Sequence, residues 1–120
     1  MRWPAVGTVV SMRRVVLDSD RAAFDDEDIH DLYSTVAMVR DAEHVSRYLF
    51  RQGLEPGEEG AGASIQLRHD APVPVGATVD VVATVTHAEG RRMETSVTFV
   101  HDGEVKATAT FTQVALGTSS

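Results

Sequence analysis

The sequence contains no cysteine among its 120 residues. Disulfide bonds, thiolate metal sites and a cysteine nucleophile are therefore excluded. No apolar run approaches the roughly 20 residues that a membrane-spanning helix needs. The first ten residues, MRWPAVGTVV, lack the apolar core and small-residue cleavage site of a signal peptide. We therefore expect a cytoplasmic protein that does not associate with membranes.

Basic residues are also scarce, since 11 Lys and Arg stand against 18 Asp and Glu, for a net charge of −7. This balance argues against a broad basic face that would bind nucleic acid, although a few local arginines can still hold a small anionic ligand. The histidines lack the spacing of a zinc site, so we expect no metal. They are His30, His44, His69, His87 and His101.

The hydrophobic fraction of 42% is ordinary for a globular protein, and 120 residues suffice to bury a core. No internal repeat or linker divides the chain. We therefore expect residues 1–120 to form a single domain.

Alternating apolar and polar residues predict five strands, and a 3.6-residue period predicts one helix. The predicted strands are Val6–Leu17, Ala63–His69, Thr78–His87, Met93–Val100 and Glu104–Leu116. The helix is predicted over Ser34–Gln52, with Ser34 or Thr35 as its cap and Gly53 at its end. The acidic segment DSDRAAFDDEDIHD before it is interpreted as a loop or short helical turn, in which Phe24 and Ile29 are the large apolar residues and would anchor a lid.

One helix beside a run of antiparallel strands predicts an α+β fold. A curved antiparallel sheet wrapped around one long central helix is the hotdog arrangement. A single helix covers only part of a five-stranded sheet, so we expect the chain to pair with a second copy as a homodimer.

The predicted helix has an apolar arc made of Val36, Met38, Val39, Ala42, Val45, Leu49 and Phe50. Its polar arc consists of Arg40, Asp41, His44, Tyr48 and Arg51. Glu43 falls between Val36 and Phe50, just inside the apolar edge. Glutamate is rarely buried without a partner, so this position is informative.

His69 ends the inward-facing row of a strand, after Ala63, Ile65 and Leu67. It has two interpretations, a half-buried histidine bonded to backbone or a functional imidazole. Glu43 and Thr35 likewise have alternative interpretations, a carboxylate that reaches solvent and a simple helix cap. Together, however, a hydroxyl, a carboxylate and an imidazole near a helix N-terminus would form a hydrolytic site, because the free N–H groups there polarise a carbonyl.

The stretches YSTVAMVRDAE, LEPGEEGAGASIQLRHDAPVPVG and EGRRMETSVTFVHDG resemble the fluoroacetyl-CoA thioesterase family of hotdog proteins. The family has a Thr near the helix start, a Glu eight positions later and a His at the end of the next strand, which here are Thr35, Glu43 and His69. The resemblance implies a dimeric thioesterase that cleaves an acyl-CoA or acyl-carrier thioester with these three residues. It also implies that the backbone of Gly62 lines the acyl pocket, and that CoA or phosphopantetheine enters as part of the substrate and not as a cofactor.

We further expect Val36, Val39, Phe24 and Ile29 to contact the substrate. The phenylalanine gate of the fluoroacetyl-specific enzyme is replaced here by FDDEDIHD, so we predict no strict fluoroacetyl selectivity. Two alternatives remain open at this point. One is a hotdog hydratase or dehydratase, in which Glu43 and His69 act as acid and base. The other is a non-catalytic hotdog dimer that binds an acyl ligand.

Overall fold

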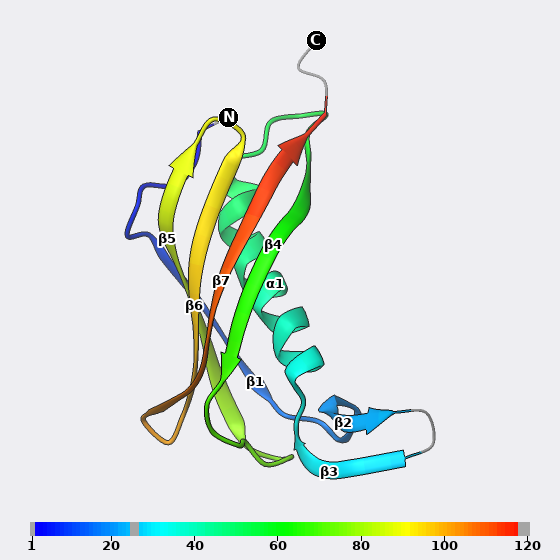
Figure 1. The fold of residues 1–120 in the computed structure, drawn as a ribbon. Helices are drawn as coiled ribbons and strands as arrows, with labels where there is room; N and C mark the ends of the chain where they lie inside the picture. The colour runs from blue at the N-terminus through cyan, green and yellow to red at the C-terminus, as the bar shows by residue number, and fades with distance from the viewer. Residues whose placement is uncertain (1, 25–26, 118–120) are drawn as a thin grey trace.

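The structure is a computed structural model that describes residues 2–24 and 27–117, with the side chains of residues 22–30 outside that description. One helix, α1 (Thr35–Gln52), lies along a five-stranded antiparallel sheet (Figure 1). The sheet strands are β1 (Val9–Val15), β4 (Glu59–His69), β5 (Thr78–Glu89), β6 (Arg92–His101) and β7 (Glu104–Leu116). The predicted helix and all five predicted strands are confirmed within a few residues.

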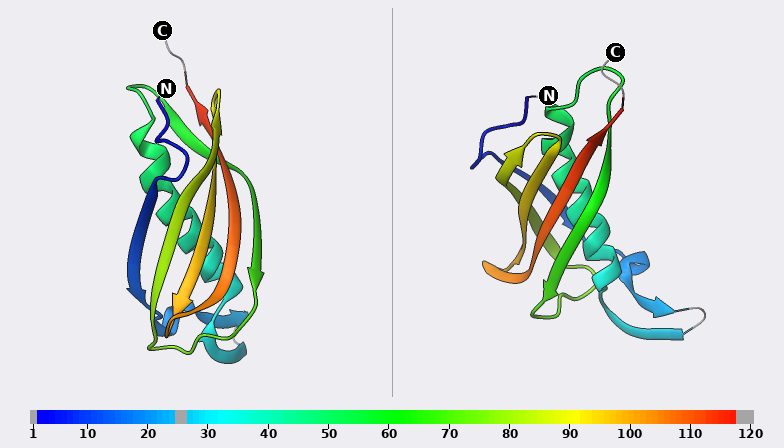
Figure 2. Two further views of the ribbon diagram at one scale, coloured as in Figure 1. Left: turned by 90° about the vertical axis from the view of Figure 1, so that its left-hand side faces the viewer. Right: turned by 45° about the horizontal axis from the view of Figure 1, so that its top comes forward.

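The strands are ordered β1-β5-β6-β7-β4, so β1 and β4 are the two edges of the sheet. The sheet curves around α1, which covers one of its faces (Figure 2). The segment DAPVPVG between β4 and β5 crosses between strands that are not neighbours, as its two prolines suggest. This is the hotdog fold that the order of elements predicts.

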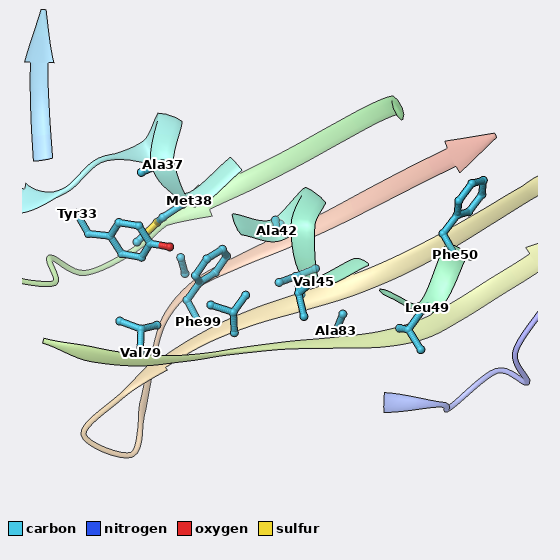
Figure 3. Close-up of a cluster of buried hydrophobic side chains, with 14 of the residues drawn as sticks. Tyr33, Ala37, Met38, Ala42, Val45, Leu49, Phe50, Val79, Ala83 and Phe99 are labelled. Atoms are coloured by element: carbon cyan, nitrogen blue, oxygen red, sulfur yellow. The ribbon is translucent and has the colours of Figure 1, made fainter. Parts of the chain in front are cut away.

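The core lies between α1 and the inner face of the sheet (Figure 3). Alternation places Val79, Val81, Ala83 and Val85 of β5 inward, and all four are buried. At the C-terminal end of α1, the Phe50 ring stacks on Trp3 with centroids 4.9 Å apart. Gly60 lies against the same ring, and a side chain there would overlap it.

The helix is rotated relative to the arc that the sequence predicts. Val36 was placed on the apolar face but is 71% exposed, whereas Asp41 was placed on the polar face and is 1% exposed. The reason is a set of buried ion pairs that holds Asp41 inside, which hydrophobic periodicity alone does not represent. Ala37 takes the inward position instead.

A β-bulge interrupts β4 and changes which residues face the helix. Gly62 lies opposite Gln113 and Ser64 opposite Thr112, which leaves Ala63 without a partner on β7. Because a bulge inserts one residue, the inward positions shift from Gly60 and Gly62 before it to Ile65, Leu67 and His69 after it. The prediction that Ala63 faces inward is therefore wrong, and Ala63 is exposed.

The acidic segment is neither a plain loop nor only a helical turn. A 3₁₀ turn (Asp18–Asp20) leads into a two-stranded antiparallel hairpin of β2 (Arg21–Phe24) and β3 (Glu27–Tyr33). The hairpin extends from the body of the molecule beside the start of α1 (Figure 1). Phe24 and Ile29 belong to its strands, but their side chains lie outside the described residues, so their predicted lid role stays a prediction.

Candidate active site

Thr35 and His69 meet at the N-terminal end of α1. Thr35 Oγ1 lies 3.2 Å from His69 Nδ1. Ser34 caps the helix, because its hydroxyl accepts a hydrogen bond from the Ala37 N–H at 3.1 Å. The Thr35 hydroxyl therefore does not serve as the helix cap. The second ring nitrogen of His69, Nε2, is buried and has no hydrogen-bond partner in the described part of the chain. Two of the three predicted catalytic residues are therefore in contact.

Glu43 lies elsewhere, two turns further along the helix. Its carboxylate oxygen Oε2 is 3.9 Å from the position that a Cβ on Gly62 would occupy. Glu43 and Gly62 border a small cavity of about 40 Å³ between α1, β4 and β7. Glu43 was expected just inside the edge of the apolar arc, but it is an exposed residue.

The two pairs are well separated within one chain. Eight helix residues at ~1.5 Å each put Thr35 and Glu43 about 12 Å apart along the axis. Gly62 and His69 are about 20 Å apart along β4. One thioester carbonyl cannot contact Glu43 and His69 of the same chain across these distances. The single chain thus brings Thr35 to His69 and Glu43 to Gly62, and does not assemble all three.

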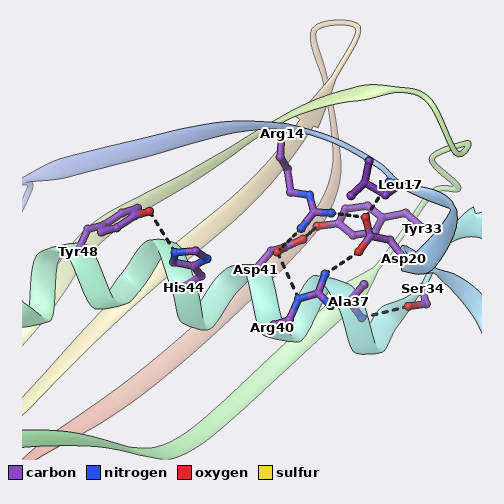
Figure 4. Close-up of polar contacts among 10 residues, drawn as sticks. All are labelled: Arg14, Leu17, Asp20, Tyr33, Ser34, Ala37, Arg40, Asp41, His44 and Tyr48. Atoms are coloured by element: carbon purple, nitrogen blue, oxygen red, sulfur yellow. Dashed lines mark hydrogen bonds and ion pairs between the residues drawn. The ribbon is translucent and has the colours of Figure 1, made fainter.

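Ion pairs of two buried carboxylates, Asp20 and Asp41, hold the start of α1 (Figure 4). Asp20, which is 2% exposed, pairs with Arg14 from β1 and with Arg40 from α1, the latter at 2.6 Å. Arg14 also binds Asp41 at 2.6 Å, and the Tyr33 hydroxyl donates to the same carboxylate. A backbone hydrogen bond also links the two segments, since the Ser34 N–H donates to the Asp20 carbonyl at 2.9 Å.

Charges in this cluster follow from its contacts. Burial works against ionisation of Asp20, but the Leu17 N–H, Arg40 and Arg14 outweigh it and hold the pKa of Asp20 below its ordinary value. Burial, together with the hydrogen bond to Asp41, raises the pKa of Tyr33 well above its usual range. Tyr33 therefore stays a neutral hydroxyl donor and Asp20 a carboxylate at neutral pH.

Gln113 and Arg47 line the cavity beside Glu43, and the sequence analysis did not predict either of them as a site residue. Gln113 continues the inward row of β7 after Ala107, Ala109 and Phe111, so a polar residue on an apolar face was the available signal. Of the predicted substrate contacts, Val39 is half-buried and Val36 is exposed.

The other described histidines have local partners. His44 lies 3.1 Å from the Tyr48 hydroxyl, and His87 lies 3.3 Å from Glu89. His101 is partly buried, and its Nδ1 lies 3.0 Å from the Thr78 carbonyl oxygen. Among the described side chains, those of residues 2–21 and 31–117, no group of three His, Asp or Glu is arranged to hold a metal ion. None of the described helices is long and apolar enough to cross a membrane.

A family model described as fluoroacetyl-CoA-specific thioesterase (FlK) matches residues 16–118. The chain belongs to this thioesterase family. The matched region contains Thr35, Glu43, Gly62 and His69, and it also contains the ion-pair residues Asp20 and Asp41.

Among curated proteins, the fluoroacetyl-CoA thioesterase of Streptantibioticus cattleyicolor is 46% identical over 50 residues. The match covers 42% of this chain and 35% of that protein, so it spans about a third of the relative's length.

Solved structures agree on the fold. A hypothetical protein of Thermus thermophilus, described as a thioesterase superfamily member, superposes with a TM-score of 0.93 at 30% identity, over 98% of this chain and 87% of that one. A structure of the fluoroacetyl-CoA thioesterase FlK gives a TM-score of 0.88 at 24% identity, over 97% of this chain and 90% of that one. A hot-dog-like protein from Thermanaerovibrio acidaminovorans also gives 0.88 at 24%, over 97% of this chain and 85% of that one.

Proposed function

We propose that this protein hydrolyses acyl-CoA thioesters at a site to which two copies of the chain contribute. The observation that carries the proposal is the contact between Thr35 and His69 beside the start of α1, with His69 Nε2 left free to act. Membership of a thioesterase family supports the reaction class.

The three side chains suit the steps of thioester cleavage. Glu43 either removes a proton from an attacking water, which gives the free acid directly, or attacks the carbonyl carbon and forms an anhydride that water then hydrolyses. Thr35 donates its hydroxyl hydrogen to His69 Nδ1, which leaves the proton of the neutral ring on Nε2. Nε2–H then protonates the departing thiolate. Thr35 acts through His69 in this scheme and is a positioning residue.

A second copy would bring Glu43 to His69. Strand β4 is an edge strand of 11 residues and offers unpaired backbone groups along one side. If β4 pairs antiparallel with β4 of another copy, the His69 end of one strand lies beside the Gly62 end of the other. Each of two equivalent sites then receives Thr35 and His69 from one protomer, and Glu43 and Gly62 from its partner.

CoA is the carrier that the comparisons favour. Variants of FlK have been solved in complex with fluoroacetate and CoA, and with acetyl-CoA. We propose that this chain likewise takes short acyl-CoA substrates. The acidic hairpin FDDEDIHD offers no aromatic gate of the FlK kind, so we expect the kcat/KM values for fluoroacetyl-CoA and acetyl-CoA to differ by less than about 10³.

The test is thiol release by the purified protein from a panel of acyl-CoAs, with hydration of an enoyl-CoA followed on the same samples. We expect thioester hydrolysis, and kcat losses on the order of 10² or more for His69→Ala and for Glu43→Ala. His44→Ala is the matched control, because His44 is an exposed imidazole on α1, and it should retain the wild-type rate.

Hydrolysis by His69→Ala at the wild-type rate would make His69 structural and the mechanism wrong. Enoyl-CoA hydration without thiol release would place the protein among the hydratases instead.

A further inference from the structure

A buried polar side chain faces the small cavity beside Glu43 and plays no part in the scheme above. The cavity measures about 40 Å³. Its lining consists of Glu43, Arg47, Gly60, Ala61, Gly62, Phe111 and Gln113. Gln113 is the neutral polar side chain of this set, and only 5% of it is exposed.

Gln113 lies on the inner face of β7, between Phe111 and Ala115. Its neighbours on that face are apolar, and its carbonyl oxygen Oε1 is buried with no hydrogen-bond partner among the described residues. Buried side-chain oxygens in native proteins nearly always have a partner, so an unpaired one that borders a cavity points to a missing donor.

The space beside Gln113 exists because Gly62 has no side chain. Gly62 is directly opposite Gln113 in the register of β4 and β7. A Cβ at Gly62 would lie 3.2 Å from the Phe111 ring and 3.9 Å from the Glu43 carboxylate. The Gln113 carboxamide and the Glu43 carboxylate therefore border one space, whose size suits two or three heavy atoms.

We propose that Gln113 determines acyl specificity by hydrogen bonding to a hydroxyl group on the acyl chain. The favoured substrates are short hydroxyacyl thioesters, with the hydroxyl on the carbon next to the carbonyl. A hydroxyl both donates and accepts, so it suits the carboxamide whichever way the amide is turned. A methyl group in the same place would leave Oε1 unpaired.

This inference rests on the proposed function, since it concerns the acyl group of the same thioester. A site that is built to hydrogen bond a substrate hydroxyl rejects the analogue that lacks it, because its own buried group is then left unpaired. We therefore expect a preference of at least about tenfold in kcat/KM for glycolyl-CoA over propionyl-CoA. These two acyl groups have nearly the same size and differ in a hydroxyl against a methyl.

The experiment compares kcat/KM for glycolyl-CoA and propionyl-CoA in wild type, Gln113→Met and Gln113→Leu. Both variants replace the carboxamide of Gln113 with an apolar group of similar size that cannot form this hydrogen bond. We expect each to bring the ratio of the two substrates to within about twofold, chiefly by lowering the glycolyl value. Gln52→Met is the matched control, since Gln52 is exposed at the C-terminal end of α1, and it should leave the ratio unchanged.

The outcomes separate the two proposals. If wild type hydrolyses both thioesters equally well, or if the ratio survives in Gln113→Met and Gln113→Leu, the specificity role is overturned while the thioesterase function stands. The wild-type ratio decides even where a variant does not fold. If wild type hydrolyses no thioester, the proposed function fails and this inference falls with it.

Discussion

Ser34 and Thr35 begin the same helix, yet their hydroxyl groups have different partners. Ser34 accepts from the Ala37 N–H, whereas Thr35 contacts His69. We predict that Ser34→Ala lowers the free energy of unfolding by about 1 kcal/mol through the lost cap. Thr35→Ala should leave stability unchanged and lower kcat at least about tenfold, and Thr35→Ser should be mild because the hydroxyl remains.

Melting temperature and thiol release on the same samples distinguish these two residues. Each of the adjacent variants serves as the control for the other. A Thr35→Ala protein that loses stability but keeps its turnover would show that Thr35 supports the helix and not His69.

Asp20 allows a prediction about pH at the level of a single carboxylate. Its pKa is depressed, so its ion pairs stabilise the fold fully above the unfolded carboxyl pKa of about 3.9, and the contribution is lost as pH falls through the lower folded value. Asp20→Asn should cost about 3 kcal/mol at pH 7, because it leaves Arg14 short of a buried partner. The difference in free energy of unfolding between wild type and Asp20→Asn should become smaller below about pH 3.9.

Urea unfolding of both proteins at pH 7 and pH 3 measures this gap. Asp80→Asn is the matched control, since Asp80 forms an ion pair with Arg13 at 2.9 Å on the surface, and it should have little effect at pH 7. An Asp20 gap that is the same at both pH values would contradict the assigned cause.

At the scale of elements, periodicity predicts the strands and the helix well but fails where a tertiary feature intervenes. β5 alternates as far as Val85 and β6 as far as Phe99, and their inward rows there are as predicted. β4 contains a bulge that no period of two can represent, so Ala63 was misplaced. The acidic hairpin is held by backbone contacts such as Tyr33 N–H to the Val73 carbonyl, at 2.8 Å, which residue patterns do not reveal.

The bulge leads to a prediction for the two glycines before it. Gly60 lies against the Phe50 ring, which is confined by Trp3, so Gly60→Ala should lower the free energy of unfolding by about 2 kcal/mol. Gly62→Ala meets Phe111 at 3.2 Å, a contact that a small shift relieves, and it fills part of the cavity beside Glu43. We expect Gly62→Ala to lose turnover with a smaller loss of stability.

Chemical denaturation and thiol release on the two variants check this difference. If Gly60→Ala and Gly62→Ala lose the same stability and have the same turnover, the cavity beside Gly62 takes no part in the reaction.

At the scale of the whole molecule, the sequence names candidate site residues, but it does not show how the fold groups them. The family resemblance implies Thr35, Glu43 and His69 as candidates, and a helix start beside a strand end accounts for the contact of Thr35 with His69. Glu43 lies two turns away on the same helix, so the proposed mechanism needs a second chain to bring a Glu43 carboxylate to His69. The sequence gives one indication of a partner chain, namely a sheet face that a single helix covers incompletely, and it does not show which residues the partner would bring to the site.

We predict a homodimer at micromolar concentration, joined through β4, and sedimentation measures the mass directly.

Mixing two inactive variants tests where each site residue comes from. When His69→Ala and Glu43→Ala homodimers are unfolded together and refolded at equal amounts, half of the dimers should contain one chain of each kind. If each site combines residues of both chains, such a heterodimer has one site with both substitutions and one site with neither. Activity should then recover to about a quarter of the wild-type value. Two His69→Ala preparations mixed in the same way are the control and should stay inactive. If Glu43 and His69 act within one chain, every site in the heterodimer carries one substitution, and the mixture stays as inactive as its parents.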